Sequence, residues 1–220
     1  MRKDVFMKKL LYIRVNPKDE SKSKGAEIGD SFLQTFQEEQ PHVEIDKINL
    51  YELNIPEIDQ DLLYARAKLS FMGYKMEDLS ESEKDKYNRM MTLREHFLSA
   101  DYYVFVTPMW NLGAPPILKS YMDNMFAFGT TFTREDGESK GLLTDKKAVH
   151  IQTRGGLYTE GPMREFEMGD QYIRKALQFL GVNMMDTVIA EGLDHFPKQV
   201  PEIMEKAKEQ AKRIAYEIAK

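Results

Sequence analysis

The sequence predicts an α/β fold in which helices cover both faces of a doubly wound, five-stranded parallel sheet. Five short strand-like segments alternate with longer segments whose apolar residues recur every three or four positions, which is typical of a parallel sheet. The third segment, 102–107, consists only of aromatic and β-branched residues, which indicates a central strand buried on both faces. No proline- or serine-rich linker interrupts the 220 residues, so we expect a single domain over residues 1–220.

The amino-terminal half is predicted to contain three strands and three helices. Ile28, Phe32 and Phe36 fall on one face of the first helix. Ser80 and Glu83 have the spacing of a capping box, which starts the third helix. The predicted elements are a strand at 10–15, a helix from 25 to 39, a strand at 43–48, a short helix at 61–69, a helix from 80 to 98 and a strand at 102–107.

The carboxyl-terminal half is predicted to contain two strands and three helices. Pro115 and Pro116 suit a helix start, where the missing N–H group costs nothing, and Gly181 ends the next helix. The predicted elements are a helix at 115–126, a polar excursion at 129–144, a strand at 148–153, a helix at 161–180, a strand at 187–191 and a helix at 201–220.

Composition narrows the function classes. The net charge is −5 with no basic cluster, so we expect no nucleic-acid binding, and no run reaches the roughly 20 apolar residues that span a bilayer. The absence of cysteine excludes disulfides and thiolate chemistry and suits a cytoplasmic protein. The four histidines are isolated in sequence, so we expect no metal site, and His150 is expected in the core.

Three loops are expected to meet above the carboxyl ends of the strands. In the common order of a doubly wound sheet the first strand lies beside the third, and a ligand-binding crevice opens where the connections reverse direction. The loops bordering this crevice would be 16–25, 107–115 and 153–162, which carry the most unusual chemistry in the sequence. We therefore expect one ligand site built from all three.

The first of these loops opens a helix and is rich in serine and lysine. Backbone N–H groups at a helix N-terminus can hold a phosphate, and Lys18, Lys22 and Lys24 add positive charge. The alternative is a solvated loop with an ordinary serine cap. Neither the Walker pattern nor the Gly-x-Gly-x-x-Gly pattern is present, so a single terminal phosphate fits better than a pyrophosphate.

The other two loops offer a flat apolar surface and close backbone approach. Trp110 and Asn111 place an aromatic ring beside an amide, which suits a flavin; alternatively, Trp110 anchors a rigid turn in the core. Gly155 and Gly156 let the backbone approach a ring edge, although an ordinary strand-to-helix turn would look the same. The aromatic residues of 126–132 could line a pocket or a dimer interface, or pack in the core.

Four motifs resemble a known family. They are Thr-Pro-Met-Trp-Asn at 107–111, Pro-Pro-Ile-Leu-Lys at 115–119, Gly-Leu-Leu-Thr-Asp-Lys-Lys-Ala at 141–148 and Arg-Gly-Gly-Leu-Tyr at 154–158. With them, nearly the whole chain resembles the bacterial FMN-dependent NADH:quinone oxidoreductases, also called FMN-dependent NADH-azoreductases. These enzymes are flavodoxin-like homodimers, so the resemblance implies that fold, a bound FMN and a homodimer.

The resemblance also implies roles for particular residues. The first loop would hold the FMN phosphate, the second would contact the isoalloxazine and ribityl groups, and the third would meet the pyrimidine edge of the ring. Relatives often have serine at positions 25 and 153 and tyrosine at position 110, so this chain departs from them there. The implied cofactor-binding residues are Asn16, Ser21, Ser23, Gly25, Pro108, Met109, Trp110, Asn111, Leu112, Thr153, Arg154, Gly155, Gly156 and Tyr158.

The implied activity is a ping-pong reduction in which NADH delivers a hydride to FMN and a quinone or azo compound then takes two electrons. The chemistry would belong to the cofactor, with no protein nucleophile and no catalytic side chain that the sequence identifies. A flavodoxin-type electron carrier serving a protein partner is the alternative. The long segments 50–79 and 129–144 favour a walled substrate pocket over that alternative.

Overall fold

The computed structural model describes residues 7–220, and residues 1–6 of the predicted domain lie outside the described part. The strands are β1 (Lys9–Arg14), β2 (Glu44–Asn49), β3 (Tyr102–Pro108), β4 (Phe132–Glu135), β5 (Glu138–Gly141), β6 (Lys147–Thr153), β7 (Asn183–Met184) and β8 (Val188–Ala190). The α-helices are α1 (Lys24–Glu39), α2 (Gln60–Phe71), α3 (Glu81–Leu98), α4 (Pro116–Met125), α5 (Gly169–Phe179) and α6 (Val200–Ile218).

The main sheet is parallel and has the order β2-β1-β3-β6, with both β7 and β8 paired to β6. The predicted position of the first strand beside the third is therefore confirmed. β7 pairs with the first residues of β6 and β8 with its last, so two short strands share the fifth position. The last of the predicted strands corresponds to β8, while β7 was not predicted.

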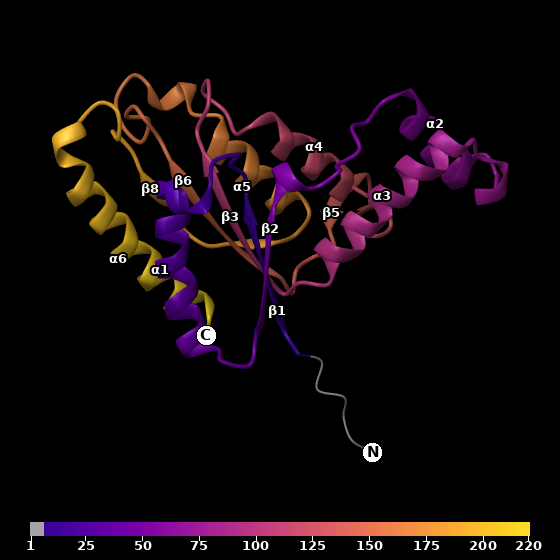
Figure 1. Ribbon diagram of the computed structural model, residues 1–220. Helices are drawn as coiled ribbons and strands as arrows, with labels where there is room; N and C mark the ends of the chain where they lie inside the picture. Colours follow the sequence, from indigo (N-terminus) through magenta and orange to yellow (C-terminus); the bar gives the residue numbers. More distant parts are fainter. Residues whose placement is uncertain (1–6) are drawn as a thin grey trace, which may run out of the picture.

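Helices cover both faces of this sheet, as the sequence predicts (Figure 1). Alternate residues of β3 face opposite layers: Val104 and Val106 pack with α1 and α6, whereas Tyr103 and Phe105 pack with α3, α4 and α5. The side chains of all four are at most 2% exposed. Burial of this strand on both sides accounts for its continuous apolar sequence.

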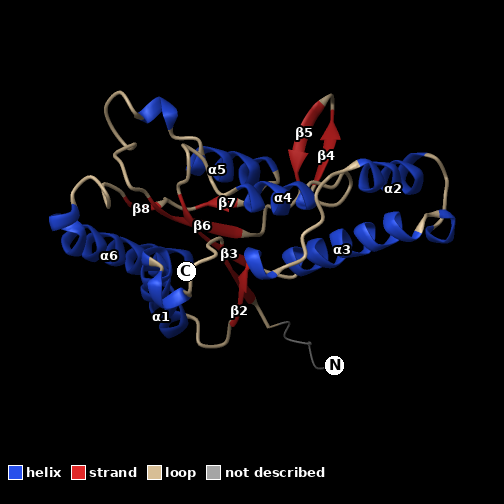
Figure 2. Ribbon diagram, turned by 45° about the horizontal axis from the view of Figure 1, so that its top comes forward, coloured by secondary structure: helices blue, strands red, loops and turns tan. Residues whose placement is uncertain are grey.

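Helices α2 and α3 form an arm that extends from the body of the molecule, as Figure 2 shows. The predicted capping box starts α3: the Ser80 hydroxyl accepts from the Glu83 N–H, and the Glu83 carboxylate accepts from the Ser80 N–H at 2.8 Å. The arm exposes large apolar side chains, among them Phe71 at 83% and Met72 at 61%. No helix within residues 7–220 is long and apolar enough to cross a membrane.

Two predicted segments differ from the structure. The helix expected at 161–180 begins only at Gly169, because the Glu167 carboxylate caps that turn by accepting from the N–H groups of Gly169 and Asp170. The residues before it form a loop with one 3-10 turn. The excursion at 129–144 contains the antiparallel hairpin β4–β5, whose turn residues Asp136 and Gly137 have φ of 52° and 87°.

Candidate functional site

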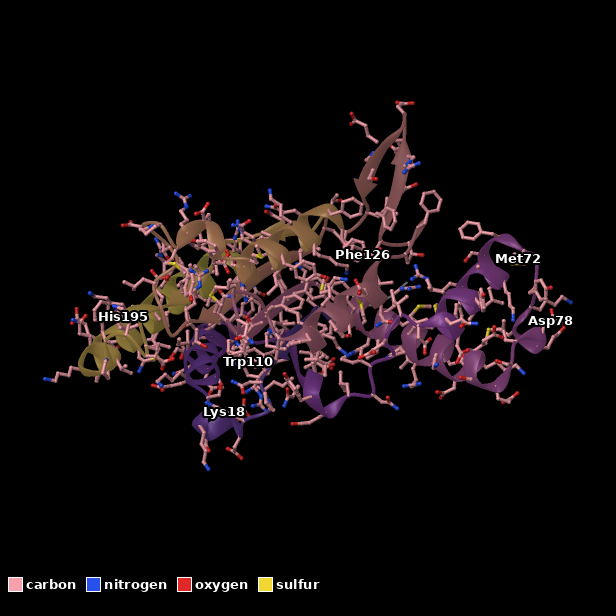
Figure 3. All side chains as sticks on the ribbon, turned by 90° about the horizontal axis from the view of Figure 1, so that it is seen from above. Lys18, Met72, Asp78, Trp110, Phe126 and His195 are labelled. Atoms are coloured by element: carbon pink, nitrogen blue, oxygen red, sulfur yellow. The ribbon has the colours of Figure 1, made fainter. Side chains whose placement is uncertain are left out.

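The loops after β1, β3 and β6 meet in one cavity at the carboxyl edge of the sheet. Its wall includes Ser23 from the first loop, Trp110 from the second and Gly155 from the third. Figure 3 looks down on this end of the molecule and shows Lys18 close to Trp110, far from the tip of the arm. The convergence that the topology predicts is therefore present in the structure.

A second hollow adjoins this cavity. The first has a volume of about 180 Å³ and the second about 760 Å³, and Met109, Gly155 and Asp194 line both. Small-molecule sites commonly occupy about 300–1,000 Å³, so the two hollows together offer room for a cofactor and a second molecule. Every predicted site residue except Ser21 lines one of them: Asn16, Ser23, Gly25, Pro108, Met109, Trp110, Thr153, Arg154 and Gly155 the first, and Asn111, Leu112, Gly156 and Tyr158 the second.

The start of α1 forms the cationic end of the cavity. Ser23 is the N-cap of α1, and its hydroxyl accepts from the Ala26 N–H at 3.3 Å. The first N–H groups of a helix have no acceptor within the helix and attract anions. The cavity wall here also includes the three lysines of the loop, Lys18, Lys22 and Lys24, so a phosphate group suits this end.

Gly25 allows this helix start to lie close to the sheet. A Cβ atom at position 25 would lie 3.0 Å from Cγ1 of Val106 and 3.7 Å from Cγ2 of Thr153. The first of these separations is tighter than ordinary van der Waals contact. Glycine therefore brings the first turn of α1 against the ends of β3 and β6, where the cationic end of the cavity forms.

Ser21 lies on the other side of its loop. Its hydroxyl donates to Asp19 Oδ1 at 2.5 Å, and its backbone N–H donates to the same oxygen at 3.0 Å. These hydrogen bonds lower the pKa of the Asp19 carboxyl. Ser21 lines a separate surface hollow, together with Arg14 and Glu52, so the structure does not bring it to the cavity.

A tight turn shapes the second loop. Trp110 and Gly113 exchange two backbone hydrogen bonds of 2.8 and 3.0 Å, and the two residues between them, Asn111 and Leu112, have φ of 47° and 74°. Positive φ at both central positions is the geometry of a type I′ turn. The turn sets Asn111 and Leu112 at the second hollow while Trp110, 37% exposed, lines the first.

The third loop presents backbone to the cavity. The Gly155 carbonyl accepts from the N–H groups of Asp194 and His195 at 3.0 and 3.1 Å. A Cβ atom on Gly155 would overlap Oδ2 of Asp194, so the Asp194 carboxylate would have to move to make room for a side chain here. Thr153 lies at the end of β6, and its carbonyl accepts from the Met109 N–H at 2.8 Å, which joins the second and third loops.

The Arg154 side chain is buried and paired with two carboxylates. It is 2% exposed and pairs with Glu167 at 3.6 Å and Glu191 at 3.3 Å. Glu191 also accepts from the Tyr158 N–H at 2.8 Å. Arg154 is part of the cavity wall, and its guanidinium holds the surrounding loops together through these ion pairs.

Sequence reasoning missed the loop that follows β8. Leu193, Asp194 and His195 line the two hollows and come directly after Gly192, which has a φ of 79°. The signal was available, because ligands bind at the carboxyl ends of all the central strands. The predicted fifth strand, 187–191, ends directly before this loop.

Comparison with known proteins identifies the family. The family model described as "Flavodoxin-like fold" matches residues 8–215. An FMN-dependent NADH:quinone oxidoreductase of Staphylococcus aureus is 44% identical over 209 residues, which cover 95% of this chain and 99% of that protein. The chain belongs to the FMN-dependent NADH:quinone oxidoreductase family.

Solved structures of this oxidoreductase family have the same fold. An azoreductase from Bacillus anthracis matches with a TM-score of 0.87 and 31% identity, covering 95% of this chain and 99% of that one. An FMN-dependent NADH-azoreductase from the same species, solved in complex with FMN, matches with a TM-score of 0.86 and 30% identity. That match covers 97% of this chain and 100% of the other.

The residues present fit the cofactor that names the family. A phosphate monoester suits the capped helix start with its lysines, and Trp110 with Met109 offers an apolar surface for a planar ring. Gly155 has no side chain where one would fill the space beside Asp194. The cavity thus has a cationic end and a flat, backbone-lined end, as a phosphorylated ring system requires.

Proposed function

We propose that this protein catalyses the FMN-dependent two-electron reduction of quinones and azo compounds by NADH. The observation that carries this proposal is the meeting of three separate loops in one cavity. A cationic helix start lies at one end and an aromatic, backbone-lined surface at the other. The family relationship and the larger adjoining hollow support an enzyme that binds two substrates in turn.

Each loop has a distinct task in this proposal. Ser23 and Gly25, with Asn16 and the lysines, hold the phosphate of FMN; residues 108–112 contact the ring and ribityl chain; Thr153 to Gly156 and Tyr158 border the ring edge. Bound FMN supplies reversible acceptance and release of a hydride. The protein positions the donor and the acceptor, and its fixed backbone N–H groups favour negative charge at the ring edge.

We also propose a cytoplasmic homodimer. The Phe128 side chain is 66% exposed, whereas the neighbouring Phe126 packs against Phe132 and Phe179. Exposed apolar groups of this kind favour association. Analytical ultracentrifugation at a series of protein concentrations measures the oligomeric state. We expect a dimer, and a monomer at every concentration contradicts this proposal.

Anaerobic mixing with NADH tests the proposed activity. The purified protein should release FMN on denaturation, and the loaded protein should lose its flavin absorption on addition of NADH alone and regain it on addition of a quinone. A flavodoxin-type carrier would need a separate reductase before bleaching. Protein that takes up no FMN, or that NADH alone does not bleach, contradicts the proposal.

A further inference from the structure

A buried hydrogen-bond chain lies directly beneath the second loop. The Thr107 hydroxyl lies 2.9 Å from Nε2 of His150, and Nδ1 of His150 lies 2.7 Å from Oδ1 of Asp170. These groups come from β3, β6 and the first turn of α5. Thr107 is 1% and His150 0% exposed, so the chain is sealed from solvent at its centre.

The carboxylate fixes the donor at one end of the chain. A carboxylate can only accept, so Nδ1 of His150 donates to Asp170, and Nε2 on the other side of the ring is hydrogen-bonded to the Thr107 hydroxyl. Thr187 also donates to Asp170 at 2.7 Å and in turn accepts from Arg174 at 3.2 Å. Burial raises the pKa of the Asp170 carboxyl, but the hydrogen bonds from His150 and Thr187 outweigh it, so the pKa is lowered and the carboxylate is favoured.

Thr107, His150 and Asp170 are connected in the same order as the serine, histidine and aspartate of a hydrolase catalytic triad. The burial of Thr107 excludes a role as nucleophile. A nucleophile must touch its substrate, and the Thr107 hydroxyl is covered by protein. The hydrogen-bond chain could simply stabilise the core. Its position points to a role in holding the second loop, because Thr107 is followed directly by Pro108 and the loop that lines both hollows.

A second tie connects the same two elements at the tip of the loop. The Leu112 carbonyl accepts from the Met168 N–H at 2.9 Å, immediately before α5 begins at Gly169. The loop is thus joined to the start of α5 at its base, through Thr107, and at its tip, through Leu112. A loop held at both ends loses less conformational entropy when it binds a ligand.

We propose that His150 is a positioning residue that fixes the 110–113 turn by linking Thr107 to Asp170. Its effect on catalysis rests on the proposed function, because it acts through the loop that would contact FMN. The link itself does not depend on FMN, and it predicts that the loop is already ordered in the flavin-free protein.

Trp110 makes the test direct, since it is the only tryptophan in the sequence and lies in the loop. Acrylamide quenching of its fluorescence in flavin-free protein reports how well the loop is held. Thr107→Val removes one hydroxyl without changing shape, and His150→Phe removes both links. Tyr103→Phe is the matched control, because it deletes a buried hydroxyl that donates to the Phe97 carbonyl at 2.9 Å at the other end of β3.

Thr107→Val should raise the quenching constant of Trp110 and weaken FMN affinity about fivefold, the factor expected for one net buried hydrogen bond. His150→Phe removes both hydrogen bonds and should have the larger effect on both values. Asp170→Asn keeps an acceptor oxygen for Nδ1 of His150, so this variant should retain most of the wild-type Trp110 quenching constant and FMN affinity. Tyr103→Phe should change neither quantity.

The proposal is overturned if Thr107→Val has the same Trp110 quenching constant and FMN affinity as Tyr103→Phe. This comparison remains decisive even if His150→Phe fails to fold. If the wild-type protein binds no FMN, the proposed function fails. The quenching comparison in flavin-free protein still shows whether the Thr107–His150–Asp170 chain holds the loop.

Discussion

At the 110–113 turn, two residues that carry side chains adopt backbone angles that favour glycine. Asn111 tolerates its φ of 47° because its short amide can hydrogen-bond locally, whereas the φ of 74° at Leu112 costs about 1–2 kcal/mol. Strained residues persist where the surrounding structure holds them, and they cluster at binding sites. The two backbone bonds between Trp110 and Gly113 provide that hold.

Two substitutions of Asn111 distinguish the contribution of its side-chain amide from that of its backbone conformation. Asn111→Gly keeps the backbone geometry and removes the amide, whereas Asn111→Ala also adds strain at positive φ. If the amide contacts FMN, both variants should weaken FMN affinity about fivefold, and only Asn111→Ala should also lower the unfolding temperature. Fluorescence titration and thermal unfolding measure the two effects, and wild-type affinity in both variants shows that the amide is dispensable.

Gly155 and Gly113 form a matched pair for testing the close approach at the third loop. A methyl group on Gly155 would meet the Asp194 carboxylate, whereas one on Gly113 has nothing within 4 Å. Gly155→Ala should displace the Asp194 carboxylate and weaken FMN affinity about tenfold, with little effect on stability because the displaced atoms are the end of an exposed side chain. Gly113→Ala should change neither value. Equal affinities in the two variants contradict the proposed approach of backbone to ring.

Among the secondary-structure elements, those with strong local signals could be predicted from sequence. The capping box of α3 and the apolar run of β3 are examples. The start of α5 could not, because Gly161 and Pro162 resemble a helix start, whereas the cap is provided by Glu167. The β4–β5 hairpin has exposed polar strands without apolar alternation, although its Asp-Gly turn is a recognised hairpin signal.

The first turn of α5 gives a pH-dependent prediction. The folded-state pKa of Asp170 is lowered relative to an unfolded value near 3.9, so its carboxylate stabilises the folded state above that pH. This stabilisation is lost as pH falls through the folded-state pKa. Asp170→Asn should therefore be less stable than wild type at pH 7 by about 1–3 kcal/mol, and the difference should shrink toward pH 3. Urea unfolding at pH 7, 5 and 3 measures it; a difference that stays constant contradicts the role of the charge.

At the scale of the whole molecule, topology made the candidate site predictable before any side chain was placed. Parallel strands end at one edge, so loops 16–25, 107–115 and 153–162 meet once β1 lies beside β3. Side-chain direction within a loop does not follow from topology. Ser21 and Ser23 are two residues apart, yet Ser23 lines the cavity while Ser21 is held outward by Asp19.

The central claim is that one ligand spans the cationic helix start and the aromatic loop. Titration of Trp110 fluorescence with FMN and with riboflavin, which lacks the phosphate, tests both ends together. Ser23→Asp keeps an effective helix cap but places a negative charge at the phosphate end, and Ser21→Asp adds the same charge outside the cavity. Wild-type protein should bind FMN more tightly than riboflavin, with Trp110 quenched by both.

In Ser23→Asp, FMN affinity should fall about tenfold or more while riboflavin affinity stays within about twofold, and Ser21→Asp should resemble wild type. Equal loss of both ligands, or Trp110 emission that saturating FMN leaves unchanged, would contradict the claim that these loops hold a single flavin.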